Sequence, residues 1–222
     1  MMQIYTGTAA GKNLDKIKEK GLGIMISPSP SFSPRKEWTD IPCALDNGAF
    51  QSYKRGFPFM ADLFRATIDK CYNVGVSLDF IVCPDIVAGG KKSLDFSMDW
   101  AMGELRTVPR LALAVQDGMQ TLDVVPYLDY FSHIFIGGSP DWKWATASTW
   151  IYFAHSRKKK VHVGQCGTVN KGKRALELDA DSIDSTNFVR NQSWEDVDDI
   201  FDGKQADLFR AETHLTPTKH DG

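Results

Sequence analysis

Eight short apolar segments recur along the chain of 222 residues, and segments with helical spacing lie between most of them. This alternation predicts parallel βαβ units and hence an α/β fold. Eight such strands favour a compact, closed (β/α)8 barrel of the TIM type, for which 222 residues is a short chain. An open, doubly wound sheet is the architectural alternative.

The predicted strands are rich in β-branched residues, and Gly, Pro, Asp or Asn stands at or near their ends. In chain order they run from Gln3 to Tyr5, Gly23 to Ser27, Cys43 to Asp46, Phe80 to Cys83, Leu111 to Gln116, His133 to Ile136, Lys160 to Val163 and Ser182 to Asp184.

Two of the helices are predicted by apolar side chains that recur every three or four residues. The first stripe contains Met60, Leu63, Phe64, Ile68, Cys71 and Tyr72, and the second contains Leu94, Met98, Ala101, Met102 and Leu105. Helices are also expected over residues 13–20, 120–130, 141–155 and 171–179. The segment from Pro28 to Asp40 is rich in Ser and Pro, which predicts a loop over the barrel mouth.

A single domain is expected, because no internal repeat or linker divides the chain. The barrel should occupy residues 1–209, followed by a polar, frayed tail at 210–222. Hydrophobic residues make up 42% and charged residues 24%, which is typical of a globular domain.

The four cysteines, Cys43, Cys71, Cys83 and Cys166, are scattered and include no Cys-x-x-Cys pair. This spacing argues against a zinc subdomain and against a disulfide framework. We expect no metal ion and no other cofactor. The chain has neither a signal-like start nor an apolar run near the ~20 residues that span a bilayer, so we expect no membrane contact and a cytoplasmic location.

Polar residues and glycines follow the predicted strands at the ends where parallel β/α folds place their sites. They are Asp46, Asp85, Gln116, the pair Gly137-Gly138, and Asp184. Taken singly, Asp46 could stabilise a turn, Asp85 could cap a helix and the glycines could close a tight turn. Their coincidence at one edge of the fold predicts a common cavity, although it does not by itself name a reaction.

The order of these residues resembles the guanine transglycosylases that act on tRNA, which are β/α barrels. Residues 46–51, Asp-Asn-Gly-Ala-Phe-Gln, resemble that family's Asp-Ser-Gly-Gly-Phe-Gln motif. Asp85 is similar to its second aspartate, and Gln116 with Gly118 is similar to its Val-Gln-Gly-Gly stretch. Gly137-Gly138 matches the glycine pair that opens its Gly-Gly-Leu-Ala loop.

The resemblance extends to the end of the last strand. Residues 181–184, Asp-Ser-Ile-Asp, are similar to the family's Val-Asp-x-Phe-Asp stretch, and Arg190-Asn191 falls where it has Arg-Asn-Gly. The printed residues contain no match to the family's cysteine and histidine zinc site, and we expect no RNA-binding extension; Ala49 and Asp117 replace family glycines. Such a reduced chain resembles the phage-type DpdA branch, which exchanges guanine in DNA for a 7-deazaguanine; a phage protein would work in the host cytoplasm.

The resemblance implies a role for each matching residue. Asp184 would attack the sugar C1′ as nucleophile, and Asp46 would move the proton of the leaving and entering bases. Asp85 would accept hydrogen bonds from N1–H and N2–H₂ of guanine. The other substrate-binding residues would be Asn47, Phe50, Gln116, Gly137 and Gly138, with Phe50 as a stacking surface and Gln116 and the Gly138 N–H on the acceptor side of the base.

Nucleic acid is the expected partner, DNA first and tRNA as the alternative, with the 7-deazaguanine base as a small-molecule substrate. The net charge of −2 gives no global basic field, so local cations would have to hold the phosphates. Arg190, Lys171, Lys173 and Arg174 are the candidates, and a solvated surface is the alternative explanation for these four residues. A homodimer or a partner protein could complete the site.

Two other classes of function stay open. A metal-dependent aldolase or hydrolase of the same fold would use Asp46, Asp85 and Asp184 as oxygen ligands for Mg²⁺. A non-catalytic binding module could retain such a pocket. The presence of both Asp46 and Asp184 argues against this alternative, because such a module would be free to lose the nucleophile.

Overall fold

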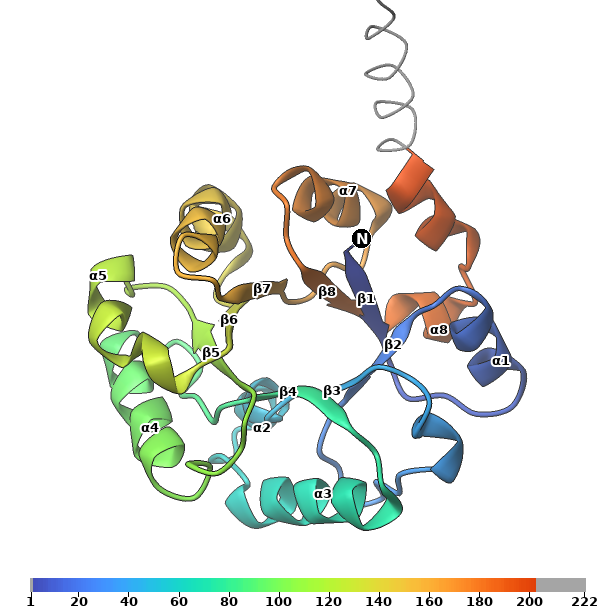
Figure 1. The fold of residues 1–222 in the computed structure, drawn as a ribbon, viewed down its shortest axis with the longest axis horizontal. Coiled ribbons are helices and arrows are strands. Elements are labelled where there is room, and N and C mark those ends of the chain that lie inside the picture. Colours follow the sequence, from blue (N-terminus) through green and yellow to red (C-terminus); the bar gives the residue numbers. More distant parts are fainter. Residues whose placement is uncertain (1, 203–222) are drawn as a thin grey trace, which may run out of the picture.

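In the computed structural model, which describes residues 2–202, eight parallel strands form a closed barrel in sequence order (Figure 1). The strands are β1 (Gln3–Thr6), β2 (Gly23–Ile26), β3 (Cys43–Leu45), β4 (Leu78–Val82), β5 (Leu111–Val115), β6 (His133–Ile136), β7 (Lys160–Val163) and β8 (Ser182–Ser185). β8 closes the barrel on β1 with Asp184 opposite Tyr5. The predicted α/β barrel is therefore confirmed, and the open sheet is wrong.

Helices surround the barrel (Figure 1). They are α1 (Lys12–Glu19), α2 (Ala49–Lys54), α3 (Ala61–Val74), α4 (Lys91–Met102), α5 (Thr121–Val124), α6 (Pro140–His155), α7 (Val169–Glu177) and α8 (Asn187–Asn191), with the 3₁₀ helices η1 (Lys36–Trp38) and η2 (Val125–Tyr130). Residues 195–202 are also helical. The two apolar stripes predicted α3 and α4, whereas α2, α8 and the helix at 195–202 were not expected.

The segment between β2 and β3 differs from its prediction as a loop over the mouth. Pro28, at its start, lies beside Gly48 in the turn between β3 and α2. Further along, Phe32 and Trp38 are buried, and the Trp38 indole N–H donates to the Ala9 carbonyl at 3.1 Å. The segment therefore fills the outer layer in place of a helix, because these two aromatic side chains gain more by packing than by facing solvent.

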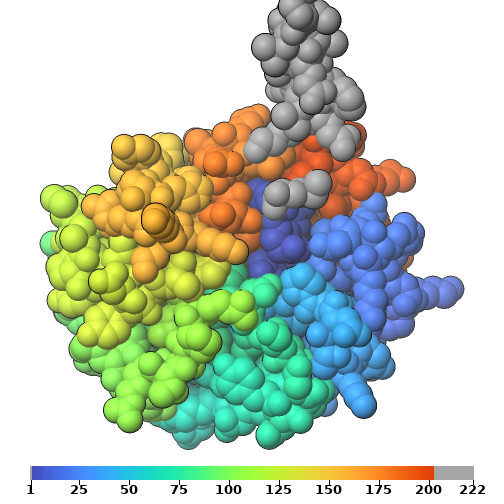
Figure 2. All heavy atoms as spheres, in the orientation of Figure 1, coloured from blue at the N-terminus to red at the C-terminus, as the bar shows by residue number. Residues whose placement is uncertain are grey.

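The core has two parts, one inside the barrel and one between the strands and the helices. The inner part consists of Tyr5, Met25, Ala44, Phe80, Val82, Ala112 and Ala114, with Phe135 packed against it. Side chains fill the spaces between the ribbons of Figure 1 on the face drawn in Figure 2. Because strand side chains alternate between the two faces, every second residue of a strand belongs to the inner part.

The predicted tail at 210–222, together with residues 203–209, lies outside the described residues. Within residues 2–202, no helix combines the length and the apolar character that crossing a membrane requires.

Candidate active site at the barrel mouth

The alternation of inward-facing residues continues to the carboxyl ends of the strands. Asp46 is two residues beyond inward-facing Ala44, and Gln116 is two residues beyond Ala114. Asp184, at the end of β8, is likewise two residues beyond buried Ser182. Because all the strands are parallel, these side chains meet at one end of the barrel, which we call the mouth.

Asp46 has a strongly perturbed acidity. Its pKa is raised to about 7, first because its carboxyl group is shielded from water and then because the carboxylates of Asp184 and Asp85 repel its charge. Hydrogen bonds from the Gly48 backbone N–H and from Ser27 Oγ, the latter at 3.4 Å, oppose this rise. Near pH 7 the group is therefore about half protonated and can both give and take a proton.

Asp184 is held through one of its two oxygens. Oδ1 accepts the Gln165 backbone N–H at 3.0 Å and lies 3.0 Å from His162 Nε2. Oδ2 makes neither of these contacts. The carboxylate is therefore fixed in orientation with its second oxygen available for chemistry.

His162 was not among the residues expected at the site. It is fully buried in the barrel interior, where its ring stacks on Phe135 with centroids 4.8 Å apart, and its Nδ1 lies 2.9 Å from Ser182 Oγ. A neutral imidazole that donates from Nε2 to the Asp184 carboxylate accepts at Nδ1 from the serine hydroxyl. The alternation along β7 could have placed this histidine inside the barrel, but not against Asp184.

Asn47 connects the end of β3 to the end of β4. Its amide donates to Asp85 Oδ1 and to the Cys83 carbonyl, both at 2.8 Å, and its Oδ1 accepts the Ala49 backbone N–H at 2.8 Å. Gly48, with φ of +79°, allows the chain to turn from β3 into α2. Asn47 therefore positions Asp85 as well as shaping the turn.

Gln116 completes this cluster from β5. Its amide nitrogen donates to Ser93 Oγ at 2.8 Å, to the Ile86 carbonyl at 2.9 Å and, more weakly, to Asp85 Oδ2 at 3.3 Å. Burial raises the pKa of Asp85, while the hydrogen bonds from Asn47 and Gln116 favour its charged form. Asp85 does not cap α4, since Gly90 occupies that position.

The glycine pair makes the turn from β6 into α6. Gly138 has φ of +75°, and a Cβ there would lie 2.6 Å from Asp117 Oδ2 and 2.8 Å from the Trp142 ring. Asp117 itself accepts the Ser139 backbone N–H at 2.7 Å and the Ser139 hydroxyl at 2.6 Å. Gly138 is therefore required by the backbone and by its neighbours, whereas Gly137 has more room.

The four predicted phosphate-binding residues have different surroundings. Lys171 is in the first turn of α7, which follows β7 at the mouth end, and Arg190 is exposed on α8. The Arg174 guanidinium lies 4.9 Å from the Trp144 ring centroid and donates to the Trp144 carbonyl at 3.0 Å. Lys173, also on α7, is half-buried. Arg174 is thus committed to α6, Lys171 is half-buried as Lys173 is, and Arg190 is exposed.

A second residue that was not expected at the mouth is Lys143 of α6. Its side chain is buried, and Nζ donates to the Gly164 carbonyl. Burial lowers the pKa of this lysine, and the nearby Asp184 carboxylate acts in the opposite direction. The sequence already placed this lysine on the apolar face of a helix, where a charged side chain is a candidate functional group.

Gly164 allows a test of how tightly the mouth is packed. A Cβ at this residue would lie 2.7 Å and 2.8 Å from two atoms of the Phe135 ring, which is stacked on His162. We expect Gly164→Ala to lower the free energy of unfolding by about 1–3 kcal/mol, because the ring must move. Chemical denaturation would measure this loss. Gly137→Ala is the matched control, since its nearest contact would be the Val115 carbonyl at 3.4 Å; an equal loss in both would contradict the argument.

Fold and site together define a class, a (β/α)8 barrel whose mouth holds three aspartates in three different environments. Neither a protein-family model nor a curated protein sequence matches the chain. Within residues 2–202, no group of three or more His, Cys, Asp or Glu side chains is arranged to hold a metal ion.

Proposed function

We propose that this protein is a base-exchange transglycosylase, a pentosyltransferase that replaces guanine in nucleic acid, with DNA as the first candidate, by a 7-deazaguanine such as 7-cyano-7-deazaguanine. The observation that carries the proposal is the pairing of two unlike carboxylates in one mouth. Asp46 has a pKa of about 7, whereas Asp184 is oriented by His162 and Gln165. Such a pair suits a reaction that needs a proton carrier and a nucleophile.

The proposed reaction gives each of these two carboxylates one task. Asp184 Oδ2 attacks the sugar C1′ as the bond from C1′ to the guanine nitrogen breaks, through an oxocarbenium-like transition state. Protonated Asp46 donates its proton to the departing guanine. In the second half, ionised Asp46 takes the proton of the 7-deazaguanine nitrogen as that nitrogen attacks C1′ and releases Asp184. The two displacements together retain the configuration at C1′.

Asp85 is the proposed reader of the base. Each of its oxygens accepts one protein hydrogen bond, from Asn47 or from Gln116, and a carboxylate oxygen has a second lone pair to offer. Guanine presents N1–H and N2–H₂ side by side, whereas adenine would leave the carboxylate without donors. A 7-deaza base has the same edge, so one pocket can accept both bases.

We expect Asp85→Ala to lower base selection far more than nucleic-acid affinity. The preference for guanine over adenine should fall by at least about a hundredfold, since an unpaired buried carboxylate no longer rejects the wrong base. Competition between guanine and adenine in the exchange assay measures selection, and fluorescence anisotropy measures affinity. Equal losses in both would count against a reading role. The control is Asp95→Ala on α4, outside the mouth cluster.

The experiment that tests the function is incubation of the protein with guanine-containing DNA, tRNA and 7-cyano-7-deazaguanine, followed by nucleoside mass spectrometry. Modified deoxyguanosine is the expected product. Modified guanosine would make tRNA the substrate. If a well-folded preparation forms neither product, with or without added Mg²⁺, the proposal is contradicted.

A further inference from the structure

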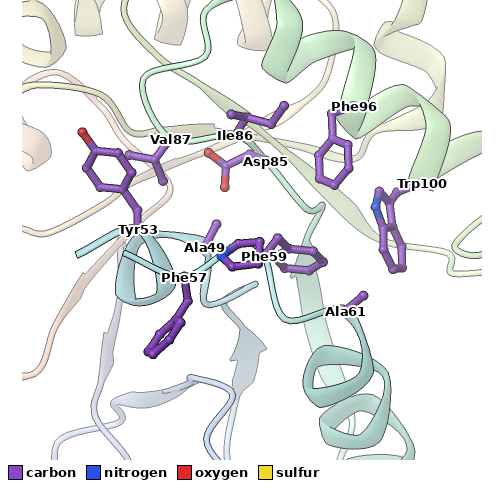
Figure 3. A pocket seen from close by; sticks show the side chains of 11 residues that line it. Ala49, Tyr53, Phe57, Phe59, Ala61, Asp85, Ile86, Val87, Phe96 and Trp100 are labelled. Atoms are coloured by element: carbon purple, nitrogen blue, oxygen red, sulfur yellow. The ribbon is translucent and has the colours of Figure 1, made fainter. Parts of the chain in front are cut away.

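Beside the mouth lies a second feature, a hollow of about 540 Å³ between α2 and α4 (Figure 3). We call it the aromatic hollow. It is lined by Ala49, Tyr53, Phe57, Pro58, Phe59, Ala61, Asp85, Ile86, Val87, Phe96 and Trp100. Asp85 is the only charged residue among these, so the hollow suits a flat apolar group that carries few hydrogen-bonding atoms.

Three of the aromatic rings that line the hollow pack against one another. Phe59 meets Trp100 edge to face at 5.6 Å and Phe96 in the same manner at 6.1 Å. On the outer wall the rings face solvent instead: Tyr53 is 57% exposed and Phe57 is 60% exposed. Two exposed aromatic side chains at the rim of a hollow mark a surface that binds something flat.

Basic side chains interleave with these rings along the same segment. Lys54 and Arg55 are exposed next to Tyr53, and neither makes an ion pair within the described part of the chain. The Lys54 ammonium lies 5.1 Å from the Phe50 ring centroid. Cations and aromatic rings in alternation are the arrangement that binds unpaired nucleotides, through phosphates and stacked bases respectively.

The hollow is continuous with the proposed catalytic mouth. Ala49 lines it directly after the turn formed by Asp46, Asn47 and Gly48. Asp85 lines it as well, and Asn47 holds that carboxylate at 2.8 Å. In Figure 3 the Asp85 carboxylate stands between the Tyr53 ring and the Phe96 ring. A strand whose target base enters the mouth would therefore leave over α2, toward the rim of the hollow.

We propose that the aromatic hollow binds an unpaired nucleobase adjacent to the exchanged one in the same strand, stacked on Tyr53 and Phe57. The inference rests on the proposed function, because it takes the substrate strand to pass through the mouth. It implies that the protein acts on a strand whose flanking bases are free of their partners. DNA and RNA share this chemistry, so both must be tested.

The test is equilibrium binding by fluorescence anisotropy, in the Asp184→Asn background so that no exchange occurs. The ligands are single-stranded deoxy- and ribo-oligonucleotides with one guanine, and matched versions in which the residues flanking that guanine are abasic. We expect Tyr53→Ala and Phe57→Ala each to weaken binding of the complete strand about tenfold, the usual effect of losing one stacked base. On the abasic strand each variant should bind as the parent does. If the substitutions weaken binding of the deoxyribose strand more, the strand is DNA; if they weaken binding of the ribose strand more, it is RNA.

Tyr152→Ala is the matched control, because Tyr152 is 78% exposed on α6, away from the residues that line the hollow. Equal losses on the complete and the abasic strands would overturn the inference. A loss of 7-deazaguanine binding without a loss of strand binding would also overturn it, by assigning the hollow to the exchanged base. Loss of a dimer in sedimentation, with strand binding unchanged, would assign the hollow to a second copy.

The binding test and the exchange assay can fail independently of each other. If the parent protein exchanges bases but strand binding does not depend on Tyr53 or Phe57, only the inference about the hollow is wrong. If bases stack on these residues but the protein modifies no nucleoside, only the proposed transglycosylase function is wrong.

Discussion

Replacing Asp184 by asparagine is expected to abolish base exchange while the barrel stays folded. The amide has the shape of the carboxylate, and its oxygen can still accept the Gln165 N–H and the proton on His162 Nε2. It is neither a good nucleophile at C1′ nor able to leave again. Loss of a nucleophile removes at least about a thousandfold in rate, which quantitative nucleoside mass spectrometry would detect.

The control for this change is Asp181→Asn, one residue before β8. Asp181 accepts the Val161 backbone N–H at 2.7 Å and pairs with His155 Nε2 at 2.8 Å, so it supports the opposite end of the barrel. We expect this variant to exchange bases at the parent rate per folded molecule, although its melting temperature should fall. Full exchange by the Asp184→Asn protein would eliminate the nucleophile assignment.

Replacing Asp46 by asparagine is expected to slow exchange by about 10²- to 10⁴-fold, the usual contribution of a general acid and base. The dependence on pH should identify the group. Protonated Asp46 assists the departure of guanine, so single-turnover guanine release should be fast below about pH 7 and fall as the pH rises through the pKa of about 7. In the Asp46→Asn protein this inflection should be absent; an unchanged inflection would assign it to another group.

Stability provides an independent check on the same residue. The pKa of Asp46 is raised from 3.8 in the unfolded chain to about 7 in the folded protein, so the folded state binds the proton more tightly. Asp46 therefore destabilises the fold progressively from about pH 4 to about pH 7 and fully above that. The Asp46→Asn protein should be more stable than the parent at pH 8, and this difference should shrink toward pH 4. Denaturation at the two pH values would measure it.

The strands and the location of the mouth could be predicted from the sequence because both depend on local patterns. Short β-branched runs separated by helices favour the strands of a covered parallel sheet, and the eight strands here form a closed barrel. The polar residues at their ends must then share one edge. This reasoning brought Asp46, Gln116 and Asp184 to the same mouth before any contact was known.

The contacts that give these residues their chemistry were decided by tertiary structure. Alternation along β7 shows that His162 faces inward, but its contact with Asp184 depends on the register between β7 and β8. The shift of the Asp46 pKa depends on burial and on the charges of Asp184 in β8 and Asp85 after β4, which no local pattern contains.

The same limit applies to α2, α8 and the aromatic hollow. The six residues of α2 and the five of α8 are too short to show an apolar stripe, so their turns form only because packing at the barrel ends stabilises them. Helical spacing predicted α3 and α4, but not the space that remains between α2 and α4. The sequence alone predicted the barrel and placed Asp46, Gln116 and Asp184 at its mouth, because periodicity and chain direction are local. Register, charge proximity and the shape of the hollow arise only when distant segments pack together.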